Sequence, residues 1–517
     1  MGALRQRELV RKHRRQTVIT VFSVVGMAFT LALASIAYLS REEAVQRRAQ
    51  AESLLQFMVG DLRGSLEPIG RLDLLEQVGD QAMVYFASVD TDDLSRPELL
   101  GQVGVLTQIG EIRLAQLRYV EALESFEQAY ARSVTLAERF PGDLELAFQR
   151  SQSEYWIGHV AFNAGDLSKA GNWWTAYLNS AQALIDSDPT NPRWQRELGY
   201  AYHNLAALAL HERNFSAAIG FFEQQLLNLM ALVKTDPDNT ELRLDLADTN
   251  SWLGSIAYDT GQLEDAKRYY RQSTKLMEVL LASDESSAIV RYWRANYMLF
   301  EYKIMLVFGE TAQAGQWLAT ALSELEKLIQ LDPQNGAWML TQIRAQTMQL
   351  ELVSTLGTMS AENRERQAEG MISQLEALKL GESGFASVPL RIVSVSRMLA
   401  KARADNGELE MAIAELRAKL PALAQALMID NEVYRTEVAR AWLTLGDLAR
   451  IADDARTAQD AWGTARAILE DPARNSLSPD VLDPWMRVLV RTGHKTDAAA
   501  ALEQLNAMGY QPLAPFS

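Results

Sequence analysis

Residues 109–126, IGEIRLAQLRYVEALESF, decide the fold of this chain, because three later segments align with them without a gap. These segments are IGHVAFNAGDLSKAGNWW (157–174), LAALALHERNFSAAIGFF (205–222) and LGSIAYDTGQLEDAKRYY (253–270), each 48 residues after the one before. Three positions carry the same kind of side chain in every segment: a small residue (Gly110, Gly158, Ala206, Gly254), an alanine (Ala122, Ala170, Ala218, Ala266) and an aromatic residue (Phe126, Trp174, Phe222, Tyr270). A fifth unit continues the 48-residue period at Gly309, Ala314 and Leu318.

The spacing of these residues predicts paired helices. A small residue lets two helix backbones approach each other, and the aromatic residue that follows in the same unit fills the space beside it. Links such as NAGDL and DTGQL turn the chain between the helices. Prolines on the same grid (Pro141, Pro189, Pro237 and Pro333) end the second helix, because proline disfavours helical geometry in the residue before it. We expect a helix of about 15 residues, a tight turn and a helix of about 20 residues in each unit.

The pattern of small residue, aromatic residue and terminal proline resembles the tetratricopeptide repeat. The resemblance is clearest at Leu253-Gly254, Ala266 and Tyr270 and in the links SDPTNP, TDPDNT and LDPQNG. It implies an all-α fold, a right-handed α-solenoid of helical hairpins that binds partners on its concave face. The usual unit has 34 residues. The longer period is attributed mainly to a longer second helix.

The pattern divides the chain into segments. Residues 100–338 hold five repeats of 48-residue period, 339–390 a degenerate helical pair, 391–507 further repeats and 508–517 a frayed tail. Residues 40–99 are expected to form a juxtamembrane helical stalk and a cap for the first repeat, since the end of a repeat array otherwise leaves an apolar face open.

The N-terminus is predicted to cross a membrane once. Residues 17–39 contain no charge and are long enough to span the hydrocarbon core as a helix. Residues 1–16 carry six Lys/Arg, which predicts a cytoplasmic basic tail and an extracytoplasmic, periplasmic repeat region on the plasma (inner) membrane of a bacterium. An alternative is a signal peptide cleaved after the Ala32-Leu33-Ala34 sequence. The layout also resembles the extracytoplasmic repeat halves of bacterial membrane signalling proteins, although 16 residues before the span are too few for an effector domain.

Composition argues against several kinds of function. The net charge of −16 disfavours nucleic-acid binding, and the absence of cysteine excludes cysteine nucleophiles and cysteine-ligated metals. Nucleotide-binding, metalloprotease and serine-hydrolase motifs are also absent from the sequence. His159 and His203 lie on neighbouring repeats and could approach each other, but ordinary groove or surface histidines are the simpler interpretation. We therefore expect no enzyme activity, no cofactor and no metal.

The resemblance places a binding groove along the first helix of each pair. It assigns the groove to polar and aromatic residues of four repeats: Gln152, Tyr155, His159, Asn163, Tyr200, His203, His211, Asp248, Ser251, Ser255, Tyr258, Asn296 and Lys303. The leading hypothesis is a non-enzymatic membrane scaffold or adaptor that binds a protein or peptide. A sensor that acts on a separate cytoplasmic partner is the alternative, and a metal-dependent enzyme using His159 and His203 is the third. The sequence does not indicate an oligomeric state.

Overall fold

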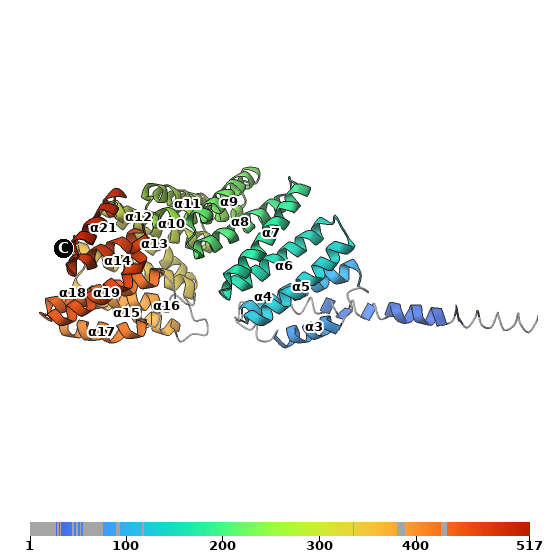
Figure 1. Ribbon diagram of the computed structural model, residues 1–517, viewed down its shortest axis with the longest axis horizontal. Helices are drawn as coiled ribbons and strands as arrows, with labels where there is room; N and C mark the ends of the chain where they lie inside the picture. Colours follow the sequence, from blue (N-terminus) through green and yellow to red (C-terminus); the bar gives the residue numbers. More distant parts are fainter. Residues whose placement is uncertain are drawn as a thin grey trace, which may run out of the picture. The chain divides into compact units, whose positions relative to one another are not determined.

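The computed structural model describes residues 76–88, 94–115, 118–333, 335–379, 388–424 and 432–516, with short parts of 27–54. Every regular element of the described residues after 75 is an α-helix (Figure 1). The chain forms two compact units, residues 1–212 and 213–517. The first contains α3 (Glu76–Ser88), α4 (Arg96–Ala115), α5 (Tyr119–Arg139), α6 (Leu144–Asn163), α7 (Leu167–Ser187) and α8 (Pro192–His211).

The second unit contains the helices from α9 onward. They are α9 (Phe215–Thr235), α10 (Thr240–Asp259), α11 (Leu263–Ser283), α12 (Ala288–Val307), α13 (Thr311–Leu331), α14 (Gly336–Leu356), α15 (Ala361–Lys379), α16 (Val388–Asp405), α17 (Leu409–Ala424), α18 (Glu432–Ile451), α19 (Ala455–Asn475), α20 (Pro479–Arg491) and α21 (Lys495–Ala507). Within each unit, successive helices pack as antiparallel hairpins that stack in chain order, as expected for an α-solenoid of tetratricopeptide-like hairpins.

Both helices of a pair are long. In the pair α6 and α7, the first helix has 20 residues and the second 21. The expectation of a 15-residue first helix was therefore wrong. The small residue and the turn mark only the last part of the first helix, and its start is set by a capping residue instead.

The capping residues follow the same 48-residue grid. Asp143, Asn191, Asn239, Ser287 and Asn335 each precede a first helix, and their side chains accept a hydrogen bond from a backbone N–H in its first turn. Such caps satisfy donors that a helix start otherwise leaves unpaired, and each contributes about 1 kcal/mol. The Asp-Pro-x-Asn links thus end one helix and begin the next.

The small and aromatic residues pack against each other as predicted. A Cβ added to Gly158 would lie 2.5 Å from Cδ1 of Trp174, and one added to Gly254 would lie 2.7 Å from the ring of Tyr270. In the fifth repeat the sizes are exchanged: Tyr302 is buried at the small-residue position and Leu318 at the aromatic position. A similar total volume therefore fills the hairpin, which is what close packing requires.

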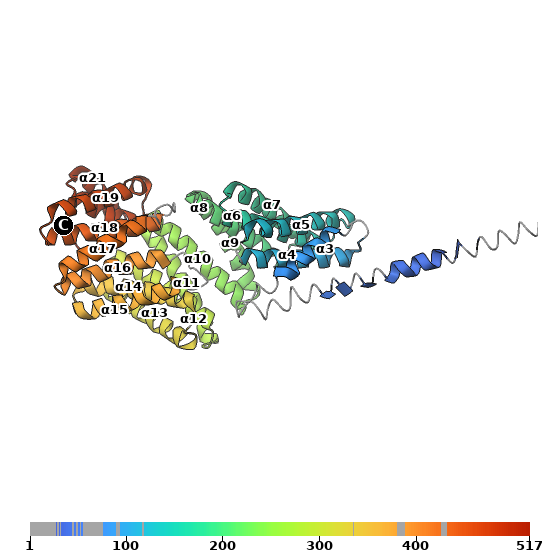
Figure 2. The same ribbon diagram turned by 90° about the horizontal axis from the view of Figure 1, so that it is seen from below.

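The C-terminal end of the second unit, which includes α21 (red in Figure 2), forms hydrogen bonds with α10 and α12. Ser478 Oγ donates a hydrogen bond of 3.0 Å to Asp259, and the backbone N–H of Gln511 donates one of 2.7 Å to the carbonyl of Val307. Residues 508–516, expected to be frayed, therefore contact the array. Val307, the partner of Gln511, lies about 200 residues away in the sequence, so a local pattern cannot reveal this contact.

The predicted tail, residues 1–16, and most of the span, 17–39, lie outside the described residues. Residues 33–43 are helical, and the apolar side chains of Ile36 and Leu39 are exposed. Among the described helices, α9 alone is long and apolar enough to cross a bilayer. Its Ala218 and Phe222 occupy the buried positions of the repeat grid, so we interpret α9 as a repeat helix.

Candidate binding pocket of the second unit

The first helices of the second unit enclose a pocket of about 510 Å³. We call it the inner pocket. Its walls come from α10, α12, α14, α16, α18 and α20, and residues 510–514 of the C-terminal tail close one side. The second helices of the pairs contribute no described residue to this lining, so the pocket lies on the side of the hairpins formed by their first helices. A pocket of this size can hold a small ligand or a segment of peptide.

Positive charge predominates in the inner pocket. Eight cations line it against five carboxylates: Lys303, Arg344, Arg391, Arg397, Lys401, Arg440, Arg487 and Arg491 against Glu351, Glu437, Asp447, Asp480 and Asp483. This excess stands in a chain whose net charge is −16. The cations are thus concentrated in the pocket of an otherwise acidic chain, and such a pocket favours an anionic ligand.

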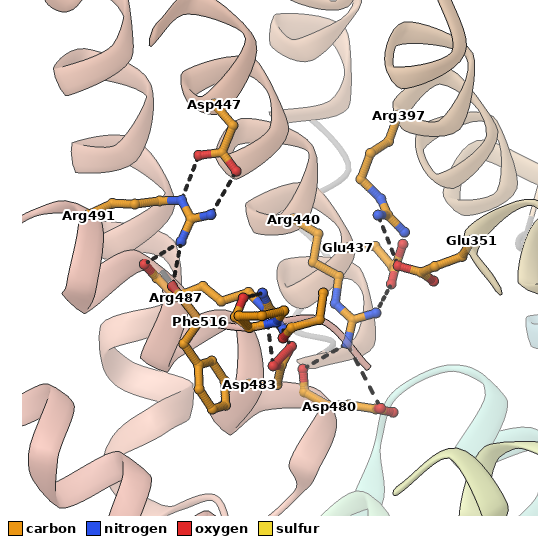
Figure 3. A network of polar contacts seen from close by, with 12 residues as sticks. Glu351, Arg397, Glu437, Arg440, Asp447, Asp480, Asp483, Arg487, Arg491 and Phe516 are labelled. Atoms are coloured by element: carbon orange, nitrogen blue, oxygen red, sulfur yellow. Dashed lines mark hydrogen bonds and ion pairs between the residues drawn. The ribbon is translucent and has the colours of Figure 1, made fainter. Parts of the chain in front are cut away.

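Most of these charged groups form one polar network (Figure 3). Arg491 binds both carboxylate oxygens of Asp447, at 2.5 and 3.0 Å, and its guanidinium also donates to the carbonyl of Phe516. Arg487 pairs with Asp483 at 2.9 Å and donates to the carbonyls of Ala514 and Pro515. The arginines of α20 therefore hold the tail against the pocket.

Asp480 connects the two ends of the unit. One of its oxygens accepts a hydrogen bond of 3.0 Å from the hydroxyl of Tyr258, and the other lies 2.6 Å from Nζ of Lys303. Arg440 approaches Asp480 from α18 at 3.9 Å. Burial tends to raise the pKa of Asp480, but the charges of Lys303 and Arg440 outweigh it, so the pKa is lowered. Asp480 is accordingly ionised at neutral pH.

Glu351 shows the effect of the positive potential in the pocket. Burial tends to raise its pKa, but the charges of Arg397, Arg440 and Lys401 outweigh this and lower the pKa to about 2. Arg397 is the nearest partner, with Nη1 3.2 Å from the carboxylate of Glu351. A carboxylate placed in this pocket is therefore held in its charged form.

Three cations of the lining lack a directly bonded partner of this kind, although carboxylates act on two of them over a longer distance, Glu437 on Arg391 and Glu351 on Lys401. Arg344, Arg391 and Lys401 make no hydrogen bond or ion pair with any residue that the structure describes, and each side chain is half-buried. The guanidinium of Arg344 lies 5.4 Å from the ring centroid of Phe300, a cation–π contact. Burial lowers the pKa of all three groups.

Of the groove residues predicted from the sequence, the structure places Tyr258 and Lys303 together in the inner pocket. Nζ of Lys303 lies 3.8 Å from the ring centroid of Tyr258. The other four in this unit do not line it. Asp248 accepts a hydrogen bond from Trp252, Ser251 and Ser255 donate to carbonyls of their own helix, and Asn296 donates to the carbonyl of Tyr292.

The remaining predicted residues lie on α6 and α8 of the first unit. Gln152 donates to the buried carboxylate of Glu197 at 2.7 Å, and the hydroxyl of Tyr177 donates to the same carboxylate at 2.5 Å. His159 stacks on Tyr155 with ring centroids 5.7 Å apart, and burial lowers the pKa of this histidine.

Four more predicted residues lie on the same two helices. Asn163 donates to the carbonyl of His159, the hydroxyl of Tyr200 accepts from Arg196, and the ring of His211 meets the ring of Phe162 edge-on at 5.5 Å. His203 is half-buried on α8. Within the described part of the chain, no three His, Asp or Glu residues are grouped closely enough to hold a metal ion.

Sequence reasoning missed the residues of α14, α16, α18 and α20 that line the inner pocket. A signal was present: Arg391, Arg397 and Lys401 lie close together in the sequence of α16 in an acidic chain. The sequence could not predict that these cations lie beside α20, because that arrangement requires the C-terminal end of the chain to contact α10 and α12.

Comparisons with known proteins agree with this fold. The family model of the tetratricopeptide repeat matches residues 247–277. A search of curated proteins finds no match. Among solved structures, the apo form of RapI is 9% identical with a TM-score of 0.50, and the alignment covers 82% of this chain and 99% of RapI.

Two other solved structures are less similar in shape. The apo quorum sensor NprR from B. thuringiensis is 14% identical with a TM-score of 0.46, covering 73% of this chain and 91% of NprR. A thermophilic TPR protein from Thermus thermophilus is 20% identical with a TM-score of 0.28, covering 47% of this chain and 98% of that protein. At these identities the likeness concerns the fold alone. The resemblance to tetratricopeptide repeats is confirmed by the family match and by the stacked hairpins.

Proposed function

We propose that this tetratricopeptide-repeat chain is a membrane-anchored, non-enzymatic scaffold that binds a peptide or a segment of a partner protein in the inner pocket. The observation that carries the proposal is the pocket itself, because the first helices of six successive hairpins contribute to one concave, polar surface. Arginines and tyrosines, the residues that most often dominate binding energy at interfaces, line it.

The choice of a polypeptide follows from the shape of this surface. The pocket is lined by six helices, and apolar side chains such as the buried Leu390 and the half-buried Met348 lie among the charged ones. An extended peptide presents polar and apolar side chains alternately, so it can satisfy both kinds of contact.

Photo-crosslinking tests this proposal. A benzoylphenylalanine at Val433, an exposed residue of the inner pocket, should crosslink to a partner polypeptide in cells, and the same group at Met411 of α17 should not. Both side chains are exposed, which makes them a matched pair. Crosslinking of the same partner from both positions, or from Met411 alone, would show that the inner pocket is not the binding surface.

The membrane part of the proposal rests on the uncharged residues 17–39 and on the six cations of residues 1–16. With the N-terminus in the cytoplasm, the repeats lie on the other side of the membrane. The chain has no cysteine, so single cysteines can be introduced without a background.

Topology can be measured by labelling those cysteines. In spheroplasts, a membrane-impermeant maleimide should label Arg474→Cys, an exposed position of α19, and should label Ala3→Cys only after lysis. Labelling of Ala3→Cys in intact spheroplasts would invert the proposed orientation. Recovery of Arg474→Cys in the soluble fraction would contradict anchoring.

A further inference from the structure

The cations of the inner pocket that form no hydrogen bond or ion pair with the described residues lie on α14 and α16. Lys303, Arg440, Arg487 and Arg491 are already engaged with Asp480, Asp483, Asp447 or carbonyls of the tail. Arg344, Arg391 and Lys401 are not engaged with any acceptor among the described residues. Nε of Arg397, buried beside them, also finds no acceptor there.

Half-buried cations without a hydrogen bond or close ion pair are costly to the folded chain. Withdrawing a charge from water is unfavourable unless an opposite charge or hydrogen-bond acceptors replace the water. Burial, followed by the like charge of Arg391, lowers the pKa of Arg344 to about 10, which reflects this cost. An anionic ligand would supply the missing acceptors, so its binding would relieve the cost.

The spacing of the cations selects the kind of anion. Arg391 and Lys401 are ten residues apart on one helix, about 15 Å along its axis. A single phosphate or carboxylate cannot contact both. An extended peptide covers that distance with about five residues, and alternate acidic side chains would then meet cations along α16.

We infer that the inner pocket binds an acidic peptide segment, whose carboxylates pair with Arg344, Arg391 and Lys401. The inference rests on the proposed function and adds the chemistry of the partner. Arginine suits this role because its planar guanidinium can bind a carboxylate through two parallel hydrogen bonds. The apolar side chains of the lining receive the residues between the acidic ones.

The test uses the full chain in detergent micelles and a fluorescent decapeptide of alternating Glu and Leu. Its matched control replaces every Glu by Gln. Fluorescence anisotropy should show the Glu peptide binding at least about tenfold more tightly than the Gln peptide, with affinity falling as salt is added. Arg344→Gln and Arg391→Gln should each weaken the Glu peptide roughly tenfold, because each removes a charge-assisted hydrogen-bonded pair. Arg474→Gln, an exposed cation outside the pocket, should leave binding unchanged.

Thermal unfolding of the same variants gives an independent readout. If Arg344 is retained for a ligand, Arg344→Gln should unfold at the same or a higher temperature than the parent while binding the Glu peptide less well. A lower unfolding temperature with undiminished peptide binding would assign Arg344 a structural role and overturn the inference.

Two further results would also overturn it. One is equal binding of the Glu and Gln peptides, and the other is binding of inorganic pyrophosphate at the arginines with no binding of the Glu peptide. Failure of the proposed function looks different. In that case the group at Val433 captures no partner, whereas capture at Val433 without any preference for acidic peptides would leave the scaffold in place and remove only this inference.

Discussion

Replacing Gly446 by alanine is expected to destabilise the second unit by about 1–3 kcal/mol, because the added methyl group would overlap the indole of Trp462. A Cβ at position 446 would meet Cδ1 and Nε1 of that ring at distances that real Cβ atoms do not adopt. Gly446 lies on α18 and Trp462 on α19, so the clash falls inside one hairpin.

The indole has little room to withdraw. Trp462 is 3% exposed, and its Nε1 donates a hydrogen bond of 3.0 Å to Asp447. Asp447 is itself held by two contacts from Arg491. A shift of the ring would therefore disturb a carboxylate that lines the inner pocket. Hydrogen exchange followed by mass spectrometry on the full chain should show faster exchange in α18 and α19.

Gly463→Ala is the matched control for this substitution. Gly463 follows Trp462 on α19, and a Cβ there would meet nothing within 4 Å. Alanine is the better helix former by about 0.5–1 kcal/mol, so Gly463→Ala should slow exchange in the same hairpin. If both substitutions changed exchange in the same direction, close packing at Gly446 would not be the cause.

The positions of Gly446 and Trp462 show how much of the fold the sequence could predict. Packing between the helices of one hairpin uses residues that are close in sequence, so it produces a repeating sequence pattern. Gly110, Gly158 and Gly254 and their aromatic partners were predicted from that pattern. The pair Tyr302 and Leu318 was harder to recognise, because the large side chain stands at the small-residue position and the smaller one at the aromatic position.

The inner pocket could be predicted only in part. Tyr258 and Lys303 were found because they occupy the inward positions of regular repeats. Their partner Asp480 follows more than 170 residues after Lys303, and its pairing depends on the unit closing on itself. Arg344 and Arg391 lie where the repeat pattern is weakest. A periodic pattern predicts contacts between neighbouring hairpins. The contact between the two ends of the unit depends instead on the sum of many small rotations from one hairpin to the next.

Glu301 gives the chain a pH-dependent stability that a single substitution should remove. Its side chain on α12 is 1% exposed, and the nearest cation, Arg271, lies 3.8 Å away. Burial is the main cause that raises the pKa of Glu301 to about 7, and Arg271 opposes it. Glu278 nearby raises the pKa further, and Lys267 lowers it.

The direction of the pH effect follows from this raised pKa. In the unfolded chain Glu301 titrates near its ordinary value of 4.5, whereas in the folded chain it holds its proton to about pH 7. Its contribution to stability is therefore complete below pH 4.5 and is lost as the pH rises through 7. A difference of this size corresponds to about 3 kcal/mol.

Glu301→Gln should therefore stabilise the second unit by roughly 2 kcal/mol at pH 8 and change it little at pH 4.5, because glutamine keeps the shape without the charge. Thermal unfolding of both chains between pH 4.5 and 8 measures the effect. Glu326→Gln, at an exposed position of α13, is the control and should leave the pH profile of the parent unchanged. Parallel profiles for the parent and Glu301→Gln would mean that Glu301 is ionised in the folded chain, with Arg271 as an effective partner despite the distance between them.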